Sequence, residues 1–210
     1  MGREAQCTAT WKRQRSEGKA LLESESVVFR GEFRVELPFA SILNVGAARG
    51  RLTVASPSGT LVLHLGDQAL RWAAKIRNPP TLADKLGVTG ATRVALVGVD
   101  DPLVVEPVRL RARSVTLRPE PASDIVIVGV NHAADLRQFA RLRTSIAPAG
   151  AIWSIRPKGV AEVSESVVRA AALAAGLVDV KVARVSETHT AEKFVVPRAQ
   201  RPVKARNPVR

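Results

Sequence analysis

Apolar and polar residues alternate along the first 65 residues, and this two-residue period is typical of half-buried β-strands. One predicted pair of strands flanks Arg30-Gly31-Glu32, and a second pair flanks Ser56-Pro57-Ser58-Gly59, because both segments have the residue types of tight turns. An earlier pair is predicted over residues 7–13 and 19–22, around a turn at residues 14–18. The first part of the chain is therefore predicted to fold as a β-sheet.

The period changes at Asp67, a residue suited to cap the N-terminus of a helix. Apolar residues then recur at helical spacing up to Ile76, and Asn78-Pro79-Pro80 ends the pattern because proline cannot continue a helix. We expect a small β-barrel or sandwich closed by one helix over residues 1–78, followed by a linker at residues 79–84.

Beyond this linker the apolar residues form two nearly continuous runs rich in β-branched side chains, at residues 93–99 and 124–130. Such runs are typical of strands that are buried on both faces of a parallel sheet. Helical spacing follows at residues 133–146 and 167–175, and further strands are expected at residues 151–155, 177–184 and 193–196. Residues 85–197 are therefore predicted to form an open α/β sheet of Rossmann-like build.

The segment between residues 99 and 124 is short for this architecture. We expect one brief connection there, with Asp100 capping a turn and Pro102 just inside it, rather than a full helix–strand–helix unit. The front half of the predicted sheet is thus abbreviated.

Composition places the chain with ordinary globular proteins, since 46% of its residues are hydrophobic and 24% are charged. No apolar run is long enough to cross a bilayer, and the first residues lack the apolar stretch of a secretory signal. The single cysteine, Cys7, excludes an internal disulfide and any metal site built from several cysteines. These features predict a cytoplasmic protein.

The net charge of +13 is concentrated near the C-terminus, where the last eighteen residues hold six Lys or Arg residues and no Asp or Glu. Three prolines in the same segment disfavour both helix and sheet. We expect residues 198–210 to form a basic, proline-rich, disordered tail. One interpretation is weak, non-specific binding of nucleic acid or an anionic surface, because clustered cations release counterions from phosphates. The other is that the tail only keeps the protein in solution.

Candidate site residues are sought where parallel strands end, because ligands of open α/β sheets bind outside the carboxyl ends of the strands. Asn131 and His132 follow the strand at residues 124–130, and Arg156 and Lys158 follow the next strand. Two cations beside a helix N-terminus suggest an anion-binding site. The alternative is that Asn131 and His132 form a strand-to-helix turn and that the cations are surface charges.

The remaining reactive side chains suggest no chemistry. Neither histidines nor carboxylates have metal-ligand spacing, and no nucleophile can be paired with a base from the sequence. His64 is expected to face solvent from its strand, and His189 to lie in a hairpin between the last two strands. We therefore predict neither a catalytic residue nor a metal.

Several short antiparallel strands closed by one amphipathic helix resemble the pleckstrin-homology-like superfold. The resemblance rests on Leu37-Pro38-Phe39-Ala40-Ser41-Ile42, followed by a hairpin strand that starts at Gly50-Arg51-Leu52. It implies a basic, anion-binding loop between the first two strands, or else a protein-binding or structural module, since fold alone does not imply function. In this chain the loop position holds Lys12, Arg13, Arg15 and Lys19.

The second half resembles the back half of class I methyltransferases. It has a strand that begins with Asp124, then a helix, a Pro148-Ala149-Gly150 turn and a strand, and finally a helix, a turn at Gly176 and a pair of strands. Residues 149–159 also resemble a bacterial family of small Rossmann-like proteins that has no established activity. These resemblances imply a fold and not an activity.

Methyltransferases of this class hold S-adenosylmethionine with a glycine-rich turn after the first strand, and dinucleotide enzymes need glycines there for the same steric reason. This chain has one glycine at that position, Gly98, which is followed by Val99, Asp100 and Asp101. Two carboxylates there would repel a pyrophosphate or the carboxylate of the cofactor. The resemblance therefore implies a degenerate cofactor loop, and no cofactor is predicted.

Together these features predict a non-catalytic binding or interaction protein, a pseudoenzyme whose expected partner is another protein. Two alternatives stay open. One is a divergent S-adenosylmethionine-dependent methyltransferase that uses His132, Arg156 and Lys158 at the rim of the sheet. The other is a binder of nucleic acid or anionic surfaces through the basic tail.

Overall fold

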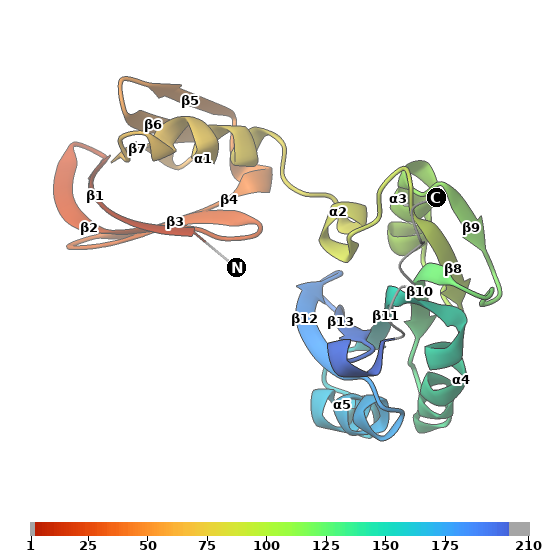
Figure 1. Cartoon of the computed structure of the whole chain (residues 1–210). Coiled ribbons are helices and arrows are strands. Elements are labelled where there is room, and N and C mark those ends of the chain that lie inside the picture. The colour runs from red at the N-terminus through yellow and green to blue at the C-terminus, as the bar shows by residue number, and fades with distance from the viewer. Residues whose placement is uncertain (1–2, 202–210) are drawn as a thin grey trace. The chain divides into compact units, whose positions relative to one another are not determined.

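The computed structural model describes residues 3–201 of the chain. It divides into two compact units, Met1–Pro80 and Thr81–Arg210. The first is a curled antiparallel sheet with one long helix, and the second is a mixed sheet with helices (Figure 1). None of the helices between residues 3 and 201 is long and apolar enough to cross a membrane.

The first unit is built on a seven-stranded antiparallel sheet in the order β4-β3-β2-β1-β7-β6-β5. The two hairpins predicted around Arg30-Gly31-Glu32 and Ser56-Pro57-Ser58-Gly59 are confirmed as β3–β4 and β6–β7. The elements are β1 (Arg3–Trp11), β2 (Gln14–Leu22), β3 (Ser26–Arg30), β4 (Arg34–Pro38), η1 (Phe39–Ser41), β5 (Asn44–Ala48), β6 (Arg51–Ser56), β7 (Gly59–His64) and α1 (Gln68–Arg77).

The first hairpin differs from its prediction. Trp11 pairs with Gln14, so the turn consists of Lys12 and Arg13 and does not lie at residues 14–18. Both turn residues have left-handed backbone, with φ of 47° and 67°. This geometry matches the right-handed twist of the two strands, which explains why a two-residue turn forms without glycine.

Helix α1 closes the concave face of this sheet (Figure 1). Its buried residues are Ala69, Trp72, Ala73 and Ile76, as the helical spacing predicted. Asp67 precedes the helix, but its side chain makes no capping hydrogen bond, so its predicted role as a cap is wrong. The helix is held by its buried face rather than by its N-terminus.

The second unit is built on a six-stranded sheet in the order β12-β13-β11-β10-β8-β9. The neighbouring strands β9, β8, β10 and β11 are parallel to one another, whereas β13 runs antiparallel to β11 and to β12. The elements are α2 (Leu82–Leu86), β8 (Arg93–Val97), α3 (Pro102–Arg111), β9 (Ser114–Thr116), β10 (Ser123–Gly129), η2 (Ala133–Arg137), α4 (Gln138–Ser145), β11 (Ile146–Pro157), η3 (Ala161–Val163), α5 (Glu165–Ala174), β12 (Val178–Arg184), β13 (His189–Val195) and η4 (Arg198–Gln200).

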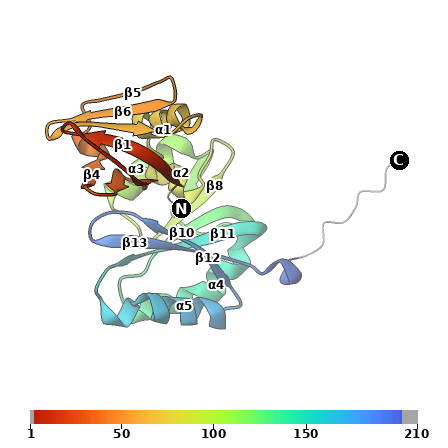
Figure 2. The same cartoon turned by 90° about the vertical axis from the view of Figure 1, so that its left-hand side faces the viewer.

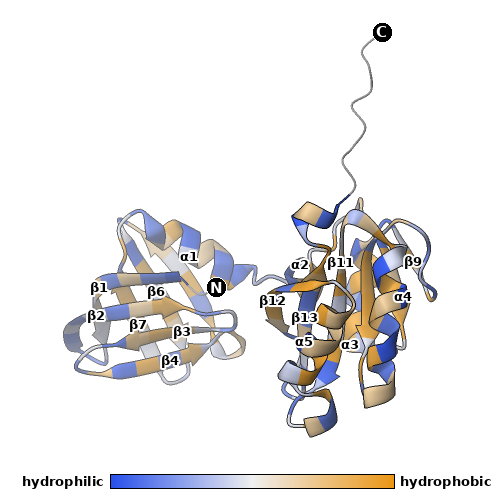
Figure 3. Ribbon diagram, turned by 60° about the horizontal axis from the view of Figure 1, so that its bottom comes forward, coloured by the Kyte–Doolittle hydropathy of each residue, from blue (hydrophilic) through white to orange (hydrophobic). Residues whose placement is uncertain are grey.

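Helices cover both faces of this sheet. Residues of α2 and α3 share one hydrophobic cluster with Trp153 of β11, whose indole Nε1 donates to the Leu86 carbonyl at 2.8 Å. Helices α4 and α5 belong to the cluster on the opposite face, where they lie along the sheet in Figure 2. The central strands β10 and β11 are apolar over most of their length, as expected of strands buried on both sides, and Figure 3 shows this for β11.

The front of the sheet holds more structure than the sequence predicted. The predicted linker at residues 79–84 contains Thr81, which caps α2 through its side chain in a capping box with Asp84. Residues 99–124 contain the ten-residue helix α3 and the short strand β9 instead of one brief connection. The connection that is shorter than a full helix–strand–helix unit is the one between β9 and β10, at residues 117–122.

The start of the predicted tail is also structured. Residues 198–200 form η4, the Arg201 Nε donates to the Val196 carbonyl at 2.9 Å, and Arg143 bonds Gln200. The rest of the predicted tail, residues 202–210, lies outside the described residues.

Candidate functional site

The carboxyl ends of β8, β10 and β11 meet at one rim of the second sheet, because these strands are parallel neighbours. Strand β13 is antiparallel to β11 and therefore begins at this rim, where His189 pairs with Pro157. The rim residues singled out from the sequence lie on turns that follow these strands, except Arg156, which was expected after its strand but lies within β11 and pairs with Thr190. The fold thus brings the candidates to one edge, and their contacts decide which of them can bind a ligand.

The turn after β8 packs tightly against the end of β10. Gly98 has φ of 61°, a left-handed conformation that favours glycine. A Cβ atom at Gly129 would lie 2.2 Å from the Gly98 carbonyl oxygen, so glycine is required there for the two backbones to approach. The turn that the sequence predicted to be a degenerate cofactor loop packs closely against the end of β10.

The two carboxylates of this turn have different tasks. Asp101 caps α3, since its Oδ1 accepts a hydrogen bond from the Leu103 backbone N–H at 2.9 Å. The predicted cap was Asp100, which instead is exposed and faces the hollows at the rim. Asp100 is therefore the carboxylate that a ligand at this turn would meet.

Two hollows open beside the turn, and both are lined by Gly98, Val99, Asp100 and Asn131. The smaller, of about 70 Å³, extends towards His189. The larger, of about 610 Å³, extends over α3 to Arg109 and Leu117. Its volume falls in the range of small-molecule sites, while the smaller hollow has room for little more than water.

Asn131 and His132 occupy the turn after β10, and Asp135 fixes that turn. The Asp135 Oδ2 accepts hydrogen bonds from the backbone N–H groups of both residues, at 2.9 and 3.0 Å. Asn131 lines both hollows, whereas His132 is exposed and its Nδ1 lies 3.3 Å from a carboxylate oxygen of Glu162. Only Asn131 is placed to contact a ligand there.

Arg156 and Lys158 do not form an open pair of cations. Arg156 is 8% exposed, and its Nε and Nη2 donate to the Glu192 Oε1 at 2.8 and 2.7 Å. The Lys158 Nζ donates to the backbone carbonyls of Ser186 and Glu187 at 2.9 and 3.1 Å. Both cations are thus held within the chain, and this argues against the anion site expected for them.

The partner of Arg156 is itself unusual. Glu192 is 3% exposed, and burial raises the pKa of its carboxyl group although Arg156 opposes the shift. Its second oxygen, Oε2, has no hydrogen-bond partner among the described residues, and neither does the hydroxyl of the fully buried Ser154. Glu192 lies on the same face of β13 as Phe194, two residues away, and Phe194 belongs to the hydrophobic cluster that contains residues of α4 and α5. The pair therefore belongs to the interior on the side of these helices.

His189 is the rim residue that the sequence did not indicate. It was expected in the hairpin that joins the last two strands, and it lies at the base of that hairpin as the first residue of β13, where it lines the smaller hollow. Its Nδ1 lies 3.0 Å from the Thr188 hydroxyl. The only signal in the sequence is that an antiparallel last strand must start where its parallel neighbour ends.

The basic residues of the first unit do not gather in one loop. Lys12 and Arg13 form the turn, while Arg15 and Lys19 lie within β2. The Lys19 Nζ pairs with Glu4 at 3.3 Å, and the Lys12 Nζ lies 5.6 Å from the ring centre of Trp11. These four cations thus do not converge on one loop, and the anion-binding loop remains a prediction. Within residues 3–201, no group of three or more potential ligands could hold a metal ion.

No family model and no curated protein matches the chain. Among solved structures, an S-adenosylmethionine-dependent methyltransferase from Aquifex aeolicus is 12% identical, with a TM-score of 0.46 over 57% of this chain and 90% of its own. A TehB-like S-adenosylmethionine-dependent methyltransferase from Corynebacterium glutamicum is 12% identical, with a TM-score of 0.37 over 62% of this chain and 97% of its own. The N-terminal pleckstrin-homology domain of the human ARAP2 protein is 14% identical, with a TM-score of 0.32 over 40% of this chain and 81% of its own. At these values the likenesses assign no function. A function for this chain therefore has to be inferred from its own residues.

Proposed function

We propose that the chain is a non-catalytic binding protein whose second unit is a methyltransferase-like scaffold without a working cofactor loop. One observation carries this proposal, namely the turn from Gly98 to Asp101. It is packed against Gly129 and commits Asp101 to the cap of α3, and it presents Asp100 to the hollow.

This arrangement disfavours the cofactor of a methyltransferase for an electrostatic reason. Asp100 would repel the carboxylate of the methionine part of S-adenosylmethionine, although it could pair with the ammonium group beside that carboxylate. The cations predicted at the same rim do not offset this repulsion, since Arg156 is paired with Glu192 and Lys158 with backbone carbonyls. The rim therefore disfavours a ligand that brings an anionic group to the turn at Asp100.

A divergent methyltransferase is the second candidate, and the larger hollow favours it. That hollow has the volume of a small-molecule site, and its lining combines apolar side chains such as Val105 and Leu117 with Asp100, Arg109 and Asn131. The basic tail keeps its place as a prediction of weak binding to nucleic acid or anionic surfaces, and residues 202–210 lie outside the described part.

A thermal-shift assay separates the first two candidates. The full chain is heated with S-adenosylmethionine, S-adenosylhomocysteine or a nicotinamide dinucleotide at about 1 mM, where a ligand of micromolar affinity stabilises a folded domain by about 3–4 kcal/mol. We expect no shift with any of them. A shift with an adenosyl compound that disappears in Asn131→Ala would favour the methyltransferase.

A further inference from the structure

A hollow of about 290 Å³ opens in the second unit, on the face of the sheet that α4 covers. It lies between the loop that joins β9 to β10 and the first two turns of α4. Among the described residues it shares only Leu117 with the hollows at the rim, so it is a separate place on this unit. We call it the α4 hollow.

The apolar side of the α4 hollow is held by the packing around it. Leu142 is 1% exposed and belongs to the cluster formed by α4 and α5, and Val97 packs against the same cluster. On the other side, the Thr116 hydroxyl donates to the Arg118 carbonyl at 2.8 Å, and Pro119 restricts the backbone of the loop. The shape of the hollow is therefore fixed by the chain, which reduces the ordering that a ligand has to impose.

Two arginines line this hollow, Arg118 from the loop and Arg141 from α4. Both are exposed, and within residues 3–201 neither guanidinium group has a hydrogen bond or an ion pair. Gln138 adds a half-buried amide, and no Asp or Glu is among the described residues of the lining. Each guanidinium thus keeps its charge and its five N–H donors for a ligand.

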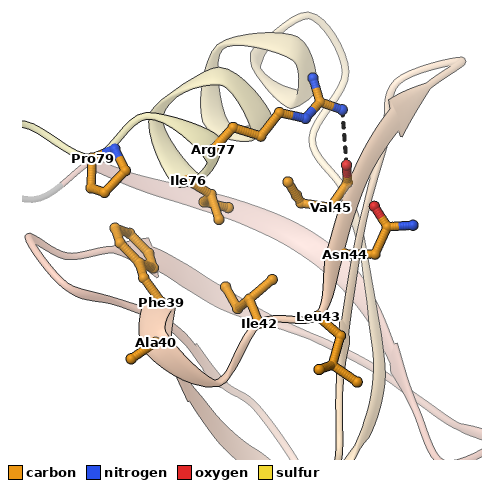
Figure 4. Close-up of a pocket in the computed structure, with 9 residues that line it drawn as sticks. All are labelled: Phe39, Ala40, Ile42, Leu43, Asn44, Val45, Ile76, Arg77 and Pro79. Carbon is orange, nitrogen blue, oxygen red and sulfur yellow. Dashed lines mark hydrogen bonds between the residues drawn. The ribbon is translucent and has the colours of Figure 1, made fainter.

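Two arginines elsewhere in the chain show the contrast. Arg77, at a hollow of the first unit, donates from its Nη2 to the Val45 carbonyl at 2.8 Å (Figure 4). Arg156, at the rim of the second unit, is paired with Glu192. The α4 hollow differs from both places because it has two cations side by side in one lining and neither is bonded within the described chain.

We propose that the α4 hollow binds an organic phosphomonoester, a small molecule with one terminal phosphate group and an apolar organic part. A phosphomonoester carries about −1.5 to −2 charges at pH 7 and so matches two guanidinium groups, whereas a carboxylate carries one charge. The guanidinium groups of Arg118 and Arg141 bind the phosphate oxygens through paired N–H groups. The organic part lies against Leu117 and Pro119.

Size narrows the ligand further. The volume of the α4 hollow is at the lower end of small-molecule sites, which span about 300–1,000 Å³. It suits one phosphate group and one ring better than a dinucleotide. The site lies outside the turn at Gly98, so its failure would leave the function proposed for the rim unchanged.

Nucleic acid is another source of phosphate, and a chain with a net charge of +13 attracts it. Its internal phosphates are diesters with one charge each, and they repeat along an extended strand. The α4 hollow instead gathers two cations in one small place with an apolar wall. We therefore choose the small molecule, and binding of nucleic acid is one outcome of the test.

An NMR titration of the isotope-labelled full chain with phenyl phosphate, in about 0.15 M salt, tests the proposal. We expect saturable one-to-one binding with a Kd of about 0.1–1 mM. Amide signals of residues 117–118 and of α4 should shift, whereas those of Gly98 and Asn131 at the rim should not. Benzoate, which keeps the ring but carries one charge, should bind about tenfold more weakly.

Substitutions separate a built site from general attraction between charges. Arg118→Gln and Arg141→Gln should each weaken the binding of phenyl phosphate by about tenfold. Arg137→Gln is the matched control and should leave binding within about twofold, because Arg137 is exposed but does not line the hollow. Leu117→Asn should weaken phenyl phosphate by about fivefold and leave inorganic phosphate unchanged, since only the former has a ring to place against Leu117. All four side chains are exposed, so these variants should fold like the wild-type chain.

Four results would overturn the proposal. The first is no saturable binding of phenyl phosphate up to about 10 mM. The second is an equal loss of affinity in Arg137→Gln and Arg141→Gln, which would show attraction by charge without a site. The third is a set of shifted signals that excludes both the loop and α4. The fourth is a single-stranded oligonucleotide that displaces phenyl phosphate and binds about a hundredfold more tightly, because the site would then belong to nucleic acid.

Discussion

Arg77 and Arg156 each stand at the end of an element and just before a proline-containing segment, yet their guanidinium groups have opposite surroundings. Arg77 is exposed beside an apolar hollow and bonds a single carbonyl. Arg156 is buried and makes two hydrogen bonds to one carboxylate oxygen of Glu192. The comparison teaches that a cation is available to a ligand only when no carboxylate of the same chain already binds it.

The same contrast holds for the regions around the two arginines. At the rim of the second unit, most polar groups hold the structure together: Asp101 caps a helix, Asp135 fixes a turn, and Lys158 bonds two carbonyls. Beside β5 of the first unit, the exposed Arg77 side chain bonds a single backbone carbonyl. The polar groups of the rim are thus largely engaged by the fold, whereas most donors of Arg77 face solvent.

Removal of Arg156 should have the largest effect on stability. Arg156→Ala leaves the Glu192 carboxylate buried without its partner, which costs about 3–5 kcal/mol in free energy of unfolding. Urea denaturation of the full chain, followed by a signal from the second unit, measures this loss. Arg141→Ala is the control, because this arginine of α4 is exposed and its loss should change the free energy of unfolding by about 0.5 kcal/mol or less.

The comparison would fail if Arg156→Ala were as stable as Arg141→Ala. Arg156 would then be a replaceable surface cation, and the anion site expected at the rim would regain support. A double variant, Arg156→Met with Glu192→Leu, sharpens the result, since loss of both charges should restore most of the stability.

A smaller loss is expected from a change at the rim turn. Gly129→Ala places a Cβ atom 2.2 Å from the Gly98 carbonyl oxygen, and the shift needed to relieve this clash should lower the free energy of unfolding by about 1–3 kcal/mol. Gly90→Ala is the matched control, because a Cβ atom there would meet nothing within 4 Å. Equal stability of the two variants would show that the rim turn is loose enough to open for a ligand.

The strands and their burial were predictable from the sequence because they depend on local periodicity. The turns around Gly31 and Pro57 and the buried face of α1 were recognised in this way. Helix α3 was missed, since only Val104 and Val108 are buried in it and Pro107 lies inside it, so its helical pattern in the sequence is weak. The Lys12-Arg13 turn was missed because neither residue is a typical turn former.

The contacts of the candidate site were much less predictable. Glu192 lies 36 residues from Arg156 in the sequence and reaches it only because β13 pairs with β11. The same pairing brings His189 to the rim. Periodicity along the chain carries no information about such pairs, so the sequence could place Arg156 at the rim but could not show that it was already paired.

The smallest expected effect concerns the pH dependence of the second unit. Hydrogen bonds from the Thr81 side chain and backbone, together with Arg111, hold the pKa of Asp84 below its ordinary value of 3.8. A carboxyl group whose pKa is lowered by folding stabilises the fold fully above its unfolded pKa, and this contribution is lost as the pH falls through the folded pKa. The urea midpoint of wild type should therefore exceed that of Asp84→Asn at about pH 6, and the gap should narrow below about pH 3.8. A gap that does not change with pH would mean that the charge of Asp84 does not stabilise α2.

Calorimetric titration of the full chain with S-adenosylhomocysteine tests most directly whether the rim of the second unit is a scaffold or a cofactor site. The measurement uses ligand up to about 1 mM and repeats the titration with Asp100→Asn, which removes the carboxylate that faces the hollow. We predict no saturable heat for the wild-type chain. Saturable one-to-one binding of micromolar affinity would contradict the account and make the second unit a cofactor-binding domain.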